Sequence, residues 1–244
     1  MIIIILGMHR SGTSTISGIL HLNKIIMGTY QNFWPRPLIQ NPKGFYENYE
    51  FRKINDAILN NSGYDVESLK SEIPKIKLND KIRRKMSKII KEYCSKYSIW
   101  GWKDPRTCLT IMEWFKMIED LNLENQVKIV FVSRRAISVA RSLKKRNNLS
   151  LDMGLSLWES YSSSALQFCK TVNIPIFYCS FENILESPQS VCIPLFEFLN
   201  KDLDLKIINK FVDKKISKNN KGEDFPQSNS IDDLEQEIQK LILK

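Results

Sequence analysis

Four short apolar runs stand out along the chain, and each ends at polar or glycine-containing residues. They cover Ile2–Leu6, Ile99–Lys103, Val127–Ser133 and Ile174–Cys179. Short runs of this kind are typical of strands that are buried on both faces of a parallel sheet. A helical pattern follows each run, directly or after a loop. Strands that alternate with helices predict an α/β protein with a parallel β-sheet flanked by helices on both faces.

The segments between these runs carry apolar residues at helical spacing. Ser187 followed by Pro188 is a helix start signal, because serine caps a helix N-terminus and proline fits the first helical position. The pattern predicts helices over Thr13–Leu22, Glu50–Asn60, Asp80–Tyr97, Thr107–Leu121, Ala136–Arg146, Leu151–Thr171 and Pro188–Asn200, with a further one at Leu205–Val212.

The pattern also suggests how the chain is divided. We expect one α/β domain over residues 1–216, followed over residues 217–244 by a polar linker and a C-terminal amphipathic helix. Ser217–Ser230 is polar and rich in helix breakers, whereas Ile231–Leu243 has apolar positions at helical spacing. Asn23–Gly44 contains three prolines and reads as a long loop, and loops of that length in compact domains usually carry function.

Composition narrows the range of partners. The chain has 244 residues, of which 43% are hydrophobic, and a formal net charge of +9. The charge is spread along the chain, so it favours an anionic ligand without choosing among a nucleotide, an acidic glycan and a nucleic acid. No segment approaches the roughly 20 apolar residues of a membrane span. The first residues, MIIIIL, lack the basic n-region of a signal peptide. We therefore expect a cytoplasmic protein with no membrane span.

Cysteines and histidines do not indicate a metal site. None of the five cysteines form a C-x-x-C pair, and their odd number does not fit a disulfide framework. His9 and His21 are the only histidines. We expect reduced, mostly buried thiols and no bound metal ion.

The segment GMHRSGTS, residues 7–14, has the form of a phosphate-binding loop. The usual loop reads G-x-x-x-x-G-K-[ST]. Gly7, Gly12 and Ser14 keep their positions here, but Thr13 replaces the lysine. A strand, a glycine loop and a helix N-terminus together bind anions, because backbone N–H groups and the helix dipole point at the ligand; the alternative is a turn that only joins strand to helix. The residues expected to bind the anion are His9, Arg10, Ser11, Gly12, Thr13 and Ser14.

The end of the third apolar run separates two uses of such a loop. A nucleoside triphosphatase needs a lysine on the phosphates and an acidic residue at a neighbouring strand end for Mg²⁺, but this run ends in Arg134 and Arg135. Cations at a helix start are unfavourable for the helix dipole, so an anionic partner is expected there. An ester of phosphate or sulfate, held by protein cations without Mg²⁺, fits these residues better than triphosphate hydrolysis does.

These motifs resemble those of the sulfotransferases that use 3′-phosphoadenosine 5′-phosphosulfate (PAPS). HRSGTS is similar to the family's loop on the 5′-phosphosulfate. Arg134 and Ser142 stand eight positions apart, as do the arginine and serine that grip the 3′-phosphate in the family, although Ala136 replaces the family's usual proline. The segments NPKGFYE and WGWKDPR resemble the bacterial branch. The resemblance covers about residues 2–199 and implies a P-loop-like fold.

The resemblance also implies roles. A sulfuryl group would pass from PAPS to a hydroxyl or amine of an unidentified acceptor, leaving adenosine 3′,5′-bisphosphate (PAP). Arg10 stands at the place of the catalytic cation in the family's loop, and Lys103 is the second candidate for stabilising the leaving oxygen.

Two carboxylates are candidates for the general base. Glu47 is favoured and Asp104 is the alternative. The structural interpretations are an ion pair with Arg106 for Asp104 and a carboxylate at a helix N-terminus for Glu47. Four aromatic residues either line the acceptor pocket or belong to the core, namely Phe33, Trp34, Tyr46 and Trp102.

Two other functions stay open. A small-molecule kinase would use the same type of loop, but the lysine and the strand-end aspartate are missing; dependence on Mg²⁺ would distinguish it. A non-catalytic binder of nucleotides or nucleic acid would fit the charge. However, no nucleic-acid module is recognisable and the basic residues do not form one stripe, so we do not expect a nucleic-acid partner.

Overall fold

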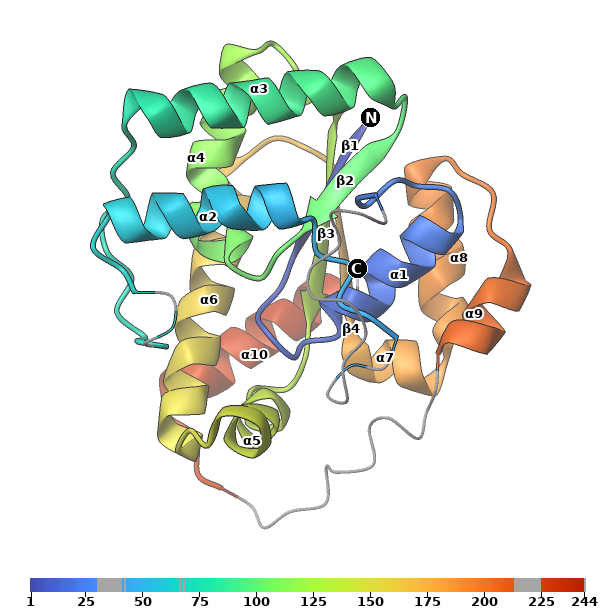
Figure 1. Cartoon of the computed structure of the whole chain (residues 1–244). Helices are drawn as coiled ribbons and strands as arrows, with labels where there is room; N and C mark the ends of the chain where they lie inside the picture. The colour runs from blue at the N-terminus through green and yellow to red at the C-terminus, as the bar shows by residue number, and fades with distance from the viewer. Residues whose placement is uncertain (30–40, 42, 66, 68, 213–224, 244) are drawn as a thin grey trace.

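The computed structural model describes residues 1–29, 41, 43–65, 67, 69–212 and 225–243. Within these residues, four parallel strands form one sheet (Figure 1): β1 (Ile2–Leu6), β2 (Trp100–Lys103), β3 (Val127–Ser133) and β4 (Ile176–Ser180). Their order is β2-β1-β3-β4. All four strands lie within two residues of the predicted bounds, and the predicted parallel sheet is confirmed.

Strand β1 lies at the centre and explains why the first run is apolar throughout. All five of its residues are fully buried. Ile5 is in register with Lys103 of β2 on one side and with Val130 of β3 on the other. Because the strands are parallel, the segments that follow them meet at one edge of the sheet.

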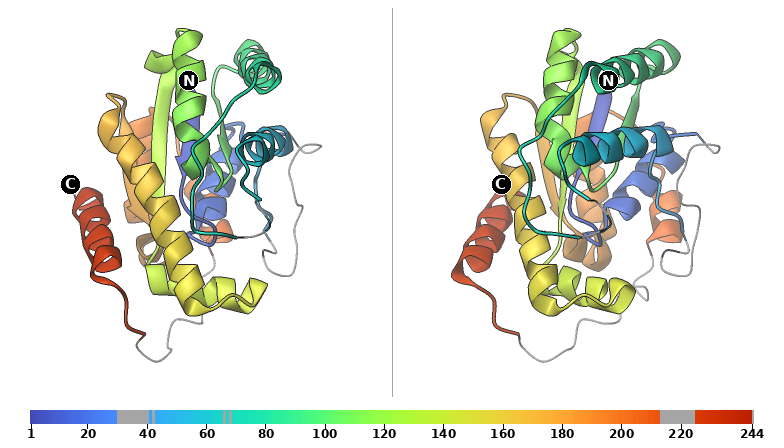
Figure 2. Two further views of the ribbon diagram at one scale, coloured as in Figure 1. Left: turned by 90° about the vertical axis from the view of Figure 1, so that its left-hand side faces the viewer. Right: turned by 60° about the vertical axis from the view of Figure 1, so that its left-hand side comes forward.

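Helices cover both faces of the sheet, as predicted (Figures 1 and 2). Alternate residues of β1 point to opposite faces, and each face has its own apolar core. One face is covered by α2 (Tyr49–Asn61), α3 (Asp80–Lys96), α4 (Thr107–Asp120), α5 (Ala136–Asn147), α6 (Leu151–Thr171) and α10 (Asn229–Ile242). The other is covered by α1 (Thr13–Leu22), α7 (Phe181–Glu186), α8 (Pro188–Leu199) and α9 (Leu205–Phe211).

An aromatic cluster fills the core between β2 and α2. Phe51 stacks on Trp102 with 4.5 Å between ring centroids and 13° between ring planes. Trp102 is fully buried, so the core interpretation is the correct one and this ring does not line an acceptor pocket. Tyr46 is half-buried against the ring of Phe211. Phe33 and Trp34 lie outside the described residues.

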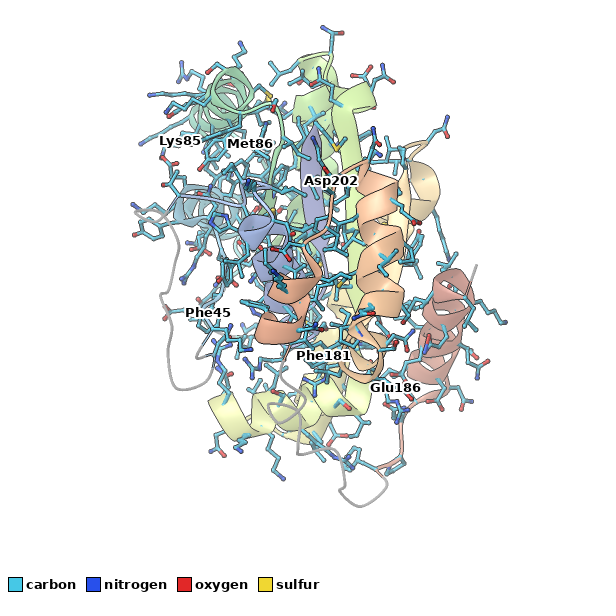
Figure 3. All side chains as sticks on the ribbon, turned by 90° about the vertical axis from the view of Figure 1, so that its right-hand side faces the viewer. Phe45, Lys85, Met86, Phe181, Glu186 and Asp202 are labelled. Carbon is cyan, nitrogen blue, oxygen red and sulfur yellow. The ribbon has the colours of Figure 1, made fainter. Side chains whose placement is uncertain are left out.

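Many of the basic residues lie on α3 and just before it. Residues 75–96 contain nine Lys or Arg against two Asp or Glu, a difference of seven charges in a chain of net charge +9. On α3, Met86 is buried while Lys85 lies on the solvent face (Figure 3). This helix lies at the opposite end of the sheet from the loop between β1 and α1 (Figure 1), so its charge does not mark the loop.

The C-terminal helix α10 packs against α6 and β4. Ile231 and Ile238 are buried in the same core as the sheet. The helix predicted over Ile231–Leu243 is thus present with nearly the same bounds. The predicted boundary between residues 216 and 217 lies outside the described residues.

Candidate functional site

The loop between β1 and α1 has a backbone that suits anion binding. Gly12 precedes α1 with a φ of +84°, and a Cβ atom there would lie 2.1 Å from the ring of Phe181. Arg10 also has a positive φ, +69°. No described side chain caps α1. The N–H group of Thr15 donates to the carbonyl of Gly12, and the N–H groups before it lie at the positive end of the helix dipole.

Contacts below the loop hold it in place. The N–H group of Gly7 donates to Sγ of Cys108 at 3.2 Å, and Ser11 donates from its N–H group to the carbonyl of Met8 at 3.2 Å. Ser11 and Thr13 are almost fully buried. Burial raises the pKa of Cys108 to about 12, so this cysteine stays a thiol and supports the loop.

Three predicted binding residues meet beside this loop. Nε of Arg10 donates to Oγ of Ser142 at 2.9 Å, and Arg134 donates from its guanidinium to the carbonyl of Arg10 at 2.9 Å. The Arg134 guanidinium also lies over the ring of Phe181, 4.9 Å from its centroid. The loop, the end of β3 and the second turn of α5 therefore come together, as the spacing of Arg134 and Ser142 predicts.

This group, which we call the arginine cluster (Arg10, Arg134 and Ser142), carries positive charge without a matching carboxylate. Burial, together with the neighbouring charges of Arg146 and Arg134, lowers the pKa of Arg10 to about 10. Burial also lowers the pKa of Arg134, against the opposing effect of Glu182. None of the ion pairs between described residues includes Arg10 or Arg134. Nε of Arg134 is buried with no hydrogen-bond partner among the described residues.

Two carboxylates near the arginine cluster accept hydrogen bonds from backbone N–H groups. Glu182 accepts from the N–H group of Arg135 at 3.2 Å, and Glu235 accepts from the N–H group of Ala136 at 2.5 Å. These are the anionic partners that the helix start of α5 requires. Neither carboxylate forms an ion pair with Arg10 or Arg134 among the described residues.

A second polar group, the ion pair of Lys103 and Glu47, which we call the lysine pair, lies at the first turn of α1. Lys103 ends β2 and is 1% exposed. Its Nζ atom donates to Oε1 of Glu47 at 2.7 Å and to Oγ of Ser14 at 3.2 Å. Arg10, to which the resemblance to sulfotransferases assigns the leaving oxygen, donates to Ser142. Lys103 is therefore a cation that contacts the first turn of α1.

Asp104 is held in an internal network. It is fully buried, and it accepts from the Arg106 guanidinium at 2.9 Å and from the Asn55 amide at 2.8 Å. Burial alone would raise the pKa of Asp104, but the charge of Arg106 and the hydrogen bond from Asn55 outweigh it and lower the pKa. A carboxylate with a lowered pKa is a poor proton acceptor, so the geometry favours the ion pair with Arg106 and leaves Glu47 as the better candidate base.

His9 completes the loop as a neutral side chain. Burial, with the charge of Arg106, lowers the pKa of His9 well below its usual value. Its ring packs against the ring of Tyr161, with 5.8 Å between the ring centroids. The imidazole is therefore uncharged at neutral pH and contributes shape to the loop.

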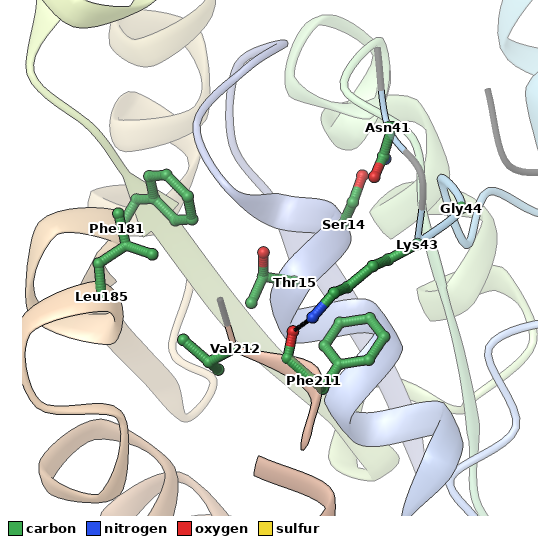
Figure 4. Close-up of a pocket in the computed structure, with 9 residues that line it drawn as sticks. All are labelled: Ser14, Thr15, Asn41, Lys43, Gly44, Phe181, Leu185, Phe211 and Val212. Carbon is green, nitrogen blue, oxygen red and sulfur yellow. Dashed lines mark hydrogen bonds between the residues drawn. The ribbon is translucent and has the colours of Figure 1, made fainter. Parts of the chain in front are cut away.

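A hollow opens next to the first turn of α1 (Figure 4). Ser14 and Thr15 line it with hydroxyl groups, and Phe181 and Phe211 line it with aromatic rings. Lys43 donates to the carbonyl of Phe211 and lies over its ring at 5.2 Å. Apolar walls with a few hydroxyl groups suit a small organic ligand.

Several residues near the loop are not predicted by the sequence patterns. Helix α7 was not predicted, although it supplies both Phe181 and Glu182 (its ends are marked by Phe181 and Glu186 in Figure 3). The available signal was position, because α7 begins directly after β4 at the same sheet edge as the loop. Glu235 lies 99 residues from Ala136, and no local pattern reveals such a contact.

Metal ions and membranes have no recognisable site in the part of the chain that the structure describes. No group of three or more His, Cys, Asp or Glu side chains is placed there to hold a metal ion. None of the described helices is long and apolar enough to cross a bilayer.

Comparison with known proteins identifies the fold. No protein-family model matches the sequence, and no curated protein matches it. Among solved structures, the sulfotransferase domain of the Synechococcus olefin synthase matches with a TM-score of 0.60 and 16% identity, covering 98% of this chain and 94% of that domain. The sulfotransferase domain from the curacin biosynthetic pathway matches with a TM-score of 0.58 and 14% identity, covering 97% and 96%. The chain thus has the fold of sulfotransferase domains, as its motifs predict.

Proposed function

We propose that this protein is a cytoplasmic sulfotransferase that moves a sulfuryl group from PAPS to a hydroxyl or amine of an acceptor. The observation that carries the proposal is that the arginine cluster and the ion pair of Lys103 with Glu47 both lie beside one loop of the phosphate-binding type, on a sulfotransferase fold. Arg134 reaches the carbonyl of Arg10, and Lys103 reaches the hydroxyl of Ser14. One group lacks a carboxylate and the other includes one, so they suit different parts of one ligand.

The residues present fit such a donor. The Nε atom of Arg134, which is buried and has no described partner, and the Ser142 hydroxyl suit a terminal phosphate, since guanidinium groups bind phosphate through paired hydrogen bonds. The uncapped N-terminus of α1 suits the phosphosulfate. The hollow beside Ser14 and Thr15 offers the apolar walls that a nucleoside requires.

The lysine pair supplies the proposed chemistry. Glu47 accepts the proton of the acceptor hydroxyl as the acceptor oxygen bonds to sulfur and the bridging S–O bond breaks. The electron pair of that bond stays on the leaving phosphate oxygen, where Lys103 neutralises the charge. Protonation of Glu47 weakens its hold on Lys103, so the lysine charge becomes available as the leaving oxygen needs it.

The contact between Lys103 and Ser14 disfavours a kinase. In a nucleoside triphosphatase, the hydroxyl at the position of Ser14 binds Mg²⁺. Here the Lys103 ammonium lies 3.2 Å from that oxygen, and a second cation at this point would be repelled. We therefore propose that PAPS binds without a metal ion.

A thermal-shift screen tests the proposal. We expect PAP, in the presence of a chelator, to raise the melting temperature more than AMP or ATP does. At about 100 times its Kd, PAP would add about 2.7 kcal/mol to the free energy of unfolding. A larger shift from ATP with Mg²⁺ than from PAP would contradict the proposal and favour the kinase.

A further inference from the structure

We infer that Arg10 determines specificity for the 3′-phosphate, as a second guanidinium ligand beside Arg134, and is not the cation at the leaving oxygen. This inference rests on the proposed function and assigns a role within it. It reverses the role that the position of Arg10 in the loop suggests.

Geometry is the first support. The Arg10 side chain is directed to Ser142 in the second turn of α5, with 2.9 Å between Nε and Oγ. The Arg10 backbone is fixed at the other end, because its carbonyl accepts from Arg134 at 2.9 Å. Arg10 thus contacts both residues that are expected to bind the 3′-phosphate. The Arg10 backbone has a positive φ of +69° in this arrangement.

Charge is the second support. Arg10 and Arg134 are both partly buried, and none of the ion pairs between described residues includes either of them. Arg146 adds a third positive charge close to Arg10. Guanidinium groups remain charged at neutral pH. A phosphate monoester, which carries close to two negative charges, would balance two of these cations.

The lysine pair differs in this respect. The charge of Lys103 is already matched by Glu47 at 2.7 Å, so this pair has no net charge to offer a dianion. A ligand with a dianionic group and a singly charged sulfate would place the dianion at the arginine cluster. Arg10 therefore contributes to the choice between a nucleotide with a 3′-phosphate and one without it.

The test compares the affinities of two nucleotides by calorimetry, without metal ions. PAP carries the 3′-phosphate and AMP lacks it. For Arg10→Gln we expect the affinity for PAP to fall about tenfold or more, while the affinity for AMP changes less than about threefold. Lys145→Gln is the matched control, because this cation on α5 is exposed; it should leave the ratio of the two affinities as in the wild type.

Two further variants keep the inference falsifiable if Arg10→Gln folds poorly. Arg10→Lys keeps the charge but not the planar fork, and should retain part of the preference for PAP. Ser142→Ala removes the group that directs Arg10, and should reduce the preference as well. If these variants keep the wild-type ratio of PAP to AMP affinity, Arg10 has no part in 3′-phosphate recognition. If the wild type itself shows no preference for PAP, the proposed function fails instead.

Discussion

Lys103 and Glu47 form an ion pair with 2.7 Å between Nζ and Oε1, and their side chains are 1% and 9% exposed. They lie 56 positions apart in the sequence. Each charge has been taken out of water at a cost that only the partner offsets. A pair of this kind beside the N-terminus of α1 is the feature on which the proposed chemistry depends.

The first prediction concerns the stability of this pair. Lys103→Met leaves the Glu47 carboxylate buried without its partner, and we expect it to lower the free energy of unfolding by about 3–5 kcal/mol. The double variant Lys103→Met/Glu47→Leu removes both charges and should recover much of that loss. Urea denaturation of the two variants and the wild type measures this. Equal losses in the single and double variants would show that the pair is not coupled as the structure indicates.

A second prediction concerns Arg134. Its guanidinium lies between the carbonyl of Arg10 and the ring of Phe181, and Arg134→Ala removes the central cation of the arginine cluster. Hydrogen bonds to charged groups contribute about 1.5–3 kcal/mol each, so the Kd for PAP should rise roughly 10–100-fold. Lys144→Ala, on the exposed side of α5, is the control and should bind PAP as the wild type does. An unchanged Kd for Arg134→Ala would place the phosphate elsewhere.

The third prediction concerns acid stability. The pKa of His9 is lowered by burial and by Arg106 from its usual 6.5, so below about pH 6.5 the unfolded chain takes up a proton that the folded protein does not. The free energy of unfolding should then fall by up to about 1.4 kcal/mol per pH unit for this group. His21, whose pKa is also lowered by burial, adds to the same trend.

The variant His9→Gln separates the two histidines. Its stability should decline less than that of the wild type between pH 7.5 and 5.5, because only His21 then remains. Urea denaturation at both pH values gives the comparison. Parallel losses in the variant and the wild type would mean that His9 is protonated as readily in the folded protein as in the unfolded chain.

The fourth prediction concerns α10. Glu235 accepts from the N–H group of Ala136, which begins α5 two residues after Arg134. Glu235→Gln should lower the free energy of unfolding by about 1–2 kcal/mol, the usual contribution of a helix cap. Asp233→Asn changes an exposed carboxylate on the same helix and should have little effect. Similar melting temperatures for the two variants would show that the cap is not stabilising.

Local patterns in the sequence predict much of the fold. The bounds of β1 and α1, and the loop between them, follow from an apolar run, two glycines and a helical pattern, all within 22 residues. Arg134 and Ser142 could be paired because a strand end and the second turn of the next helix lie on the same edge. Each of these inferences needs only the geometry of one strand–loop–helix unit.

Contacts between segments that are far apart in the sequence could not be predicted from such local patterns. The direction of the Arg10 side chain depends on where α5 lies beside the loop. Trp102 belongs to the core because Phe51 of α2 stacks on it. Glu235 reaches α5 from the last helix. In each case the partner is chosen by tertiary packing, which leaves no periodic signal in the sequence.

The most direct test of the account is a calorimetric titration of the wild type with PAP and with AMP, both in the presence of a chelator. The two nucleotides differ in the 3′-phosphate, which the arginine cluster is proposed to bind without a metal ion. We expect PAP to bind at least about tenfold more tightly than AMP. Equal affinities for the two nucleotides, or binding of PAP only when Mg²⁺ is added, would contradict the assignment of a PAPS site.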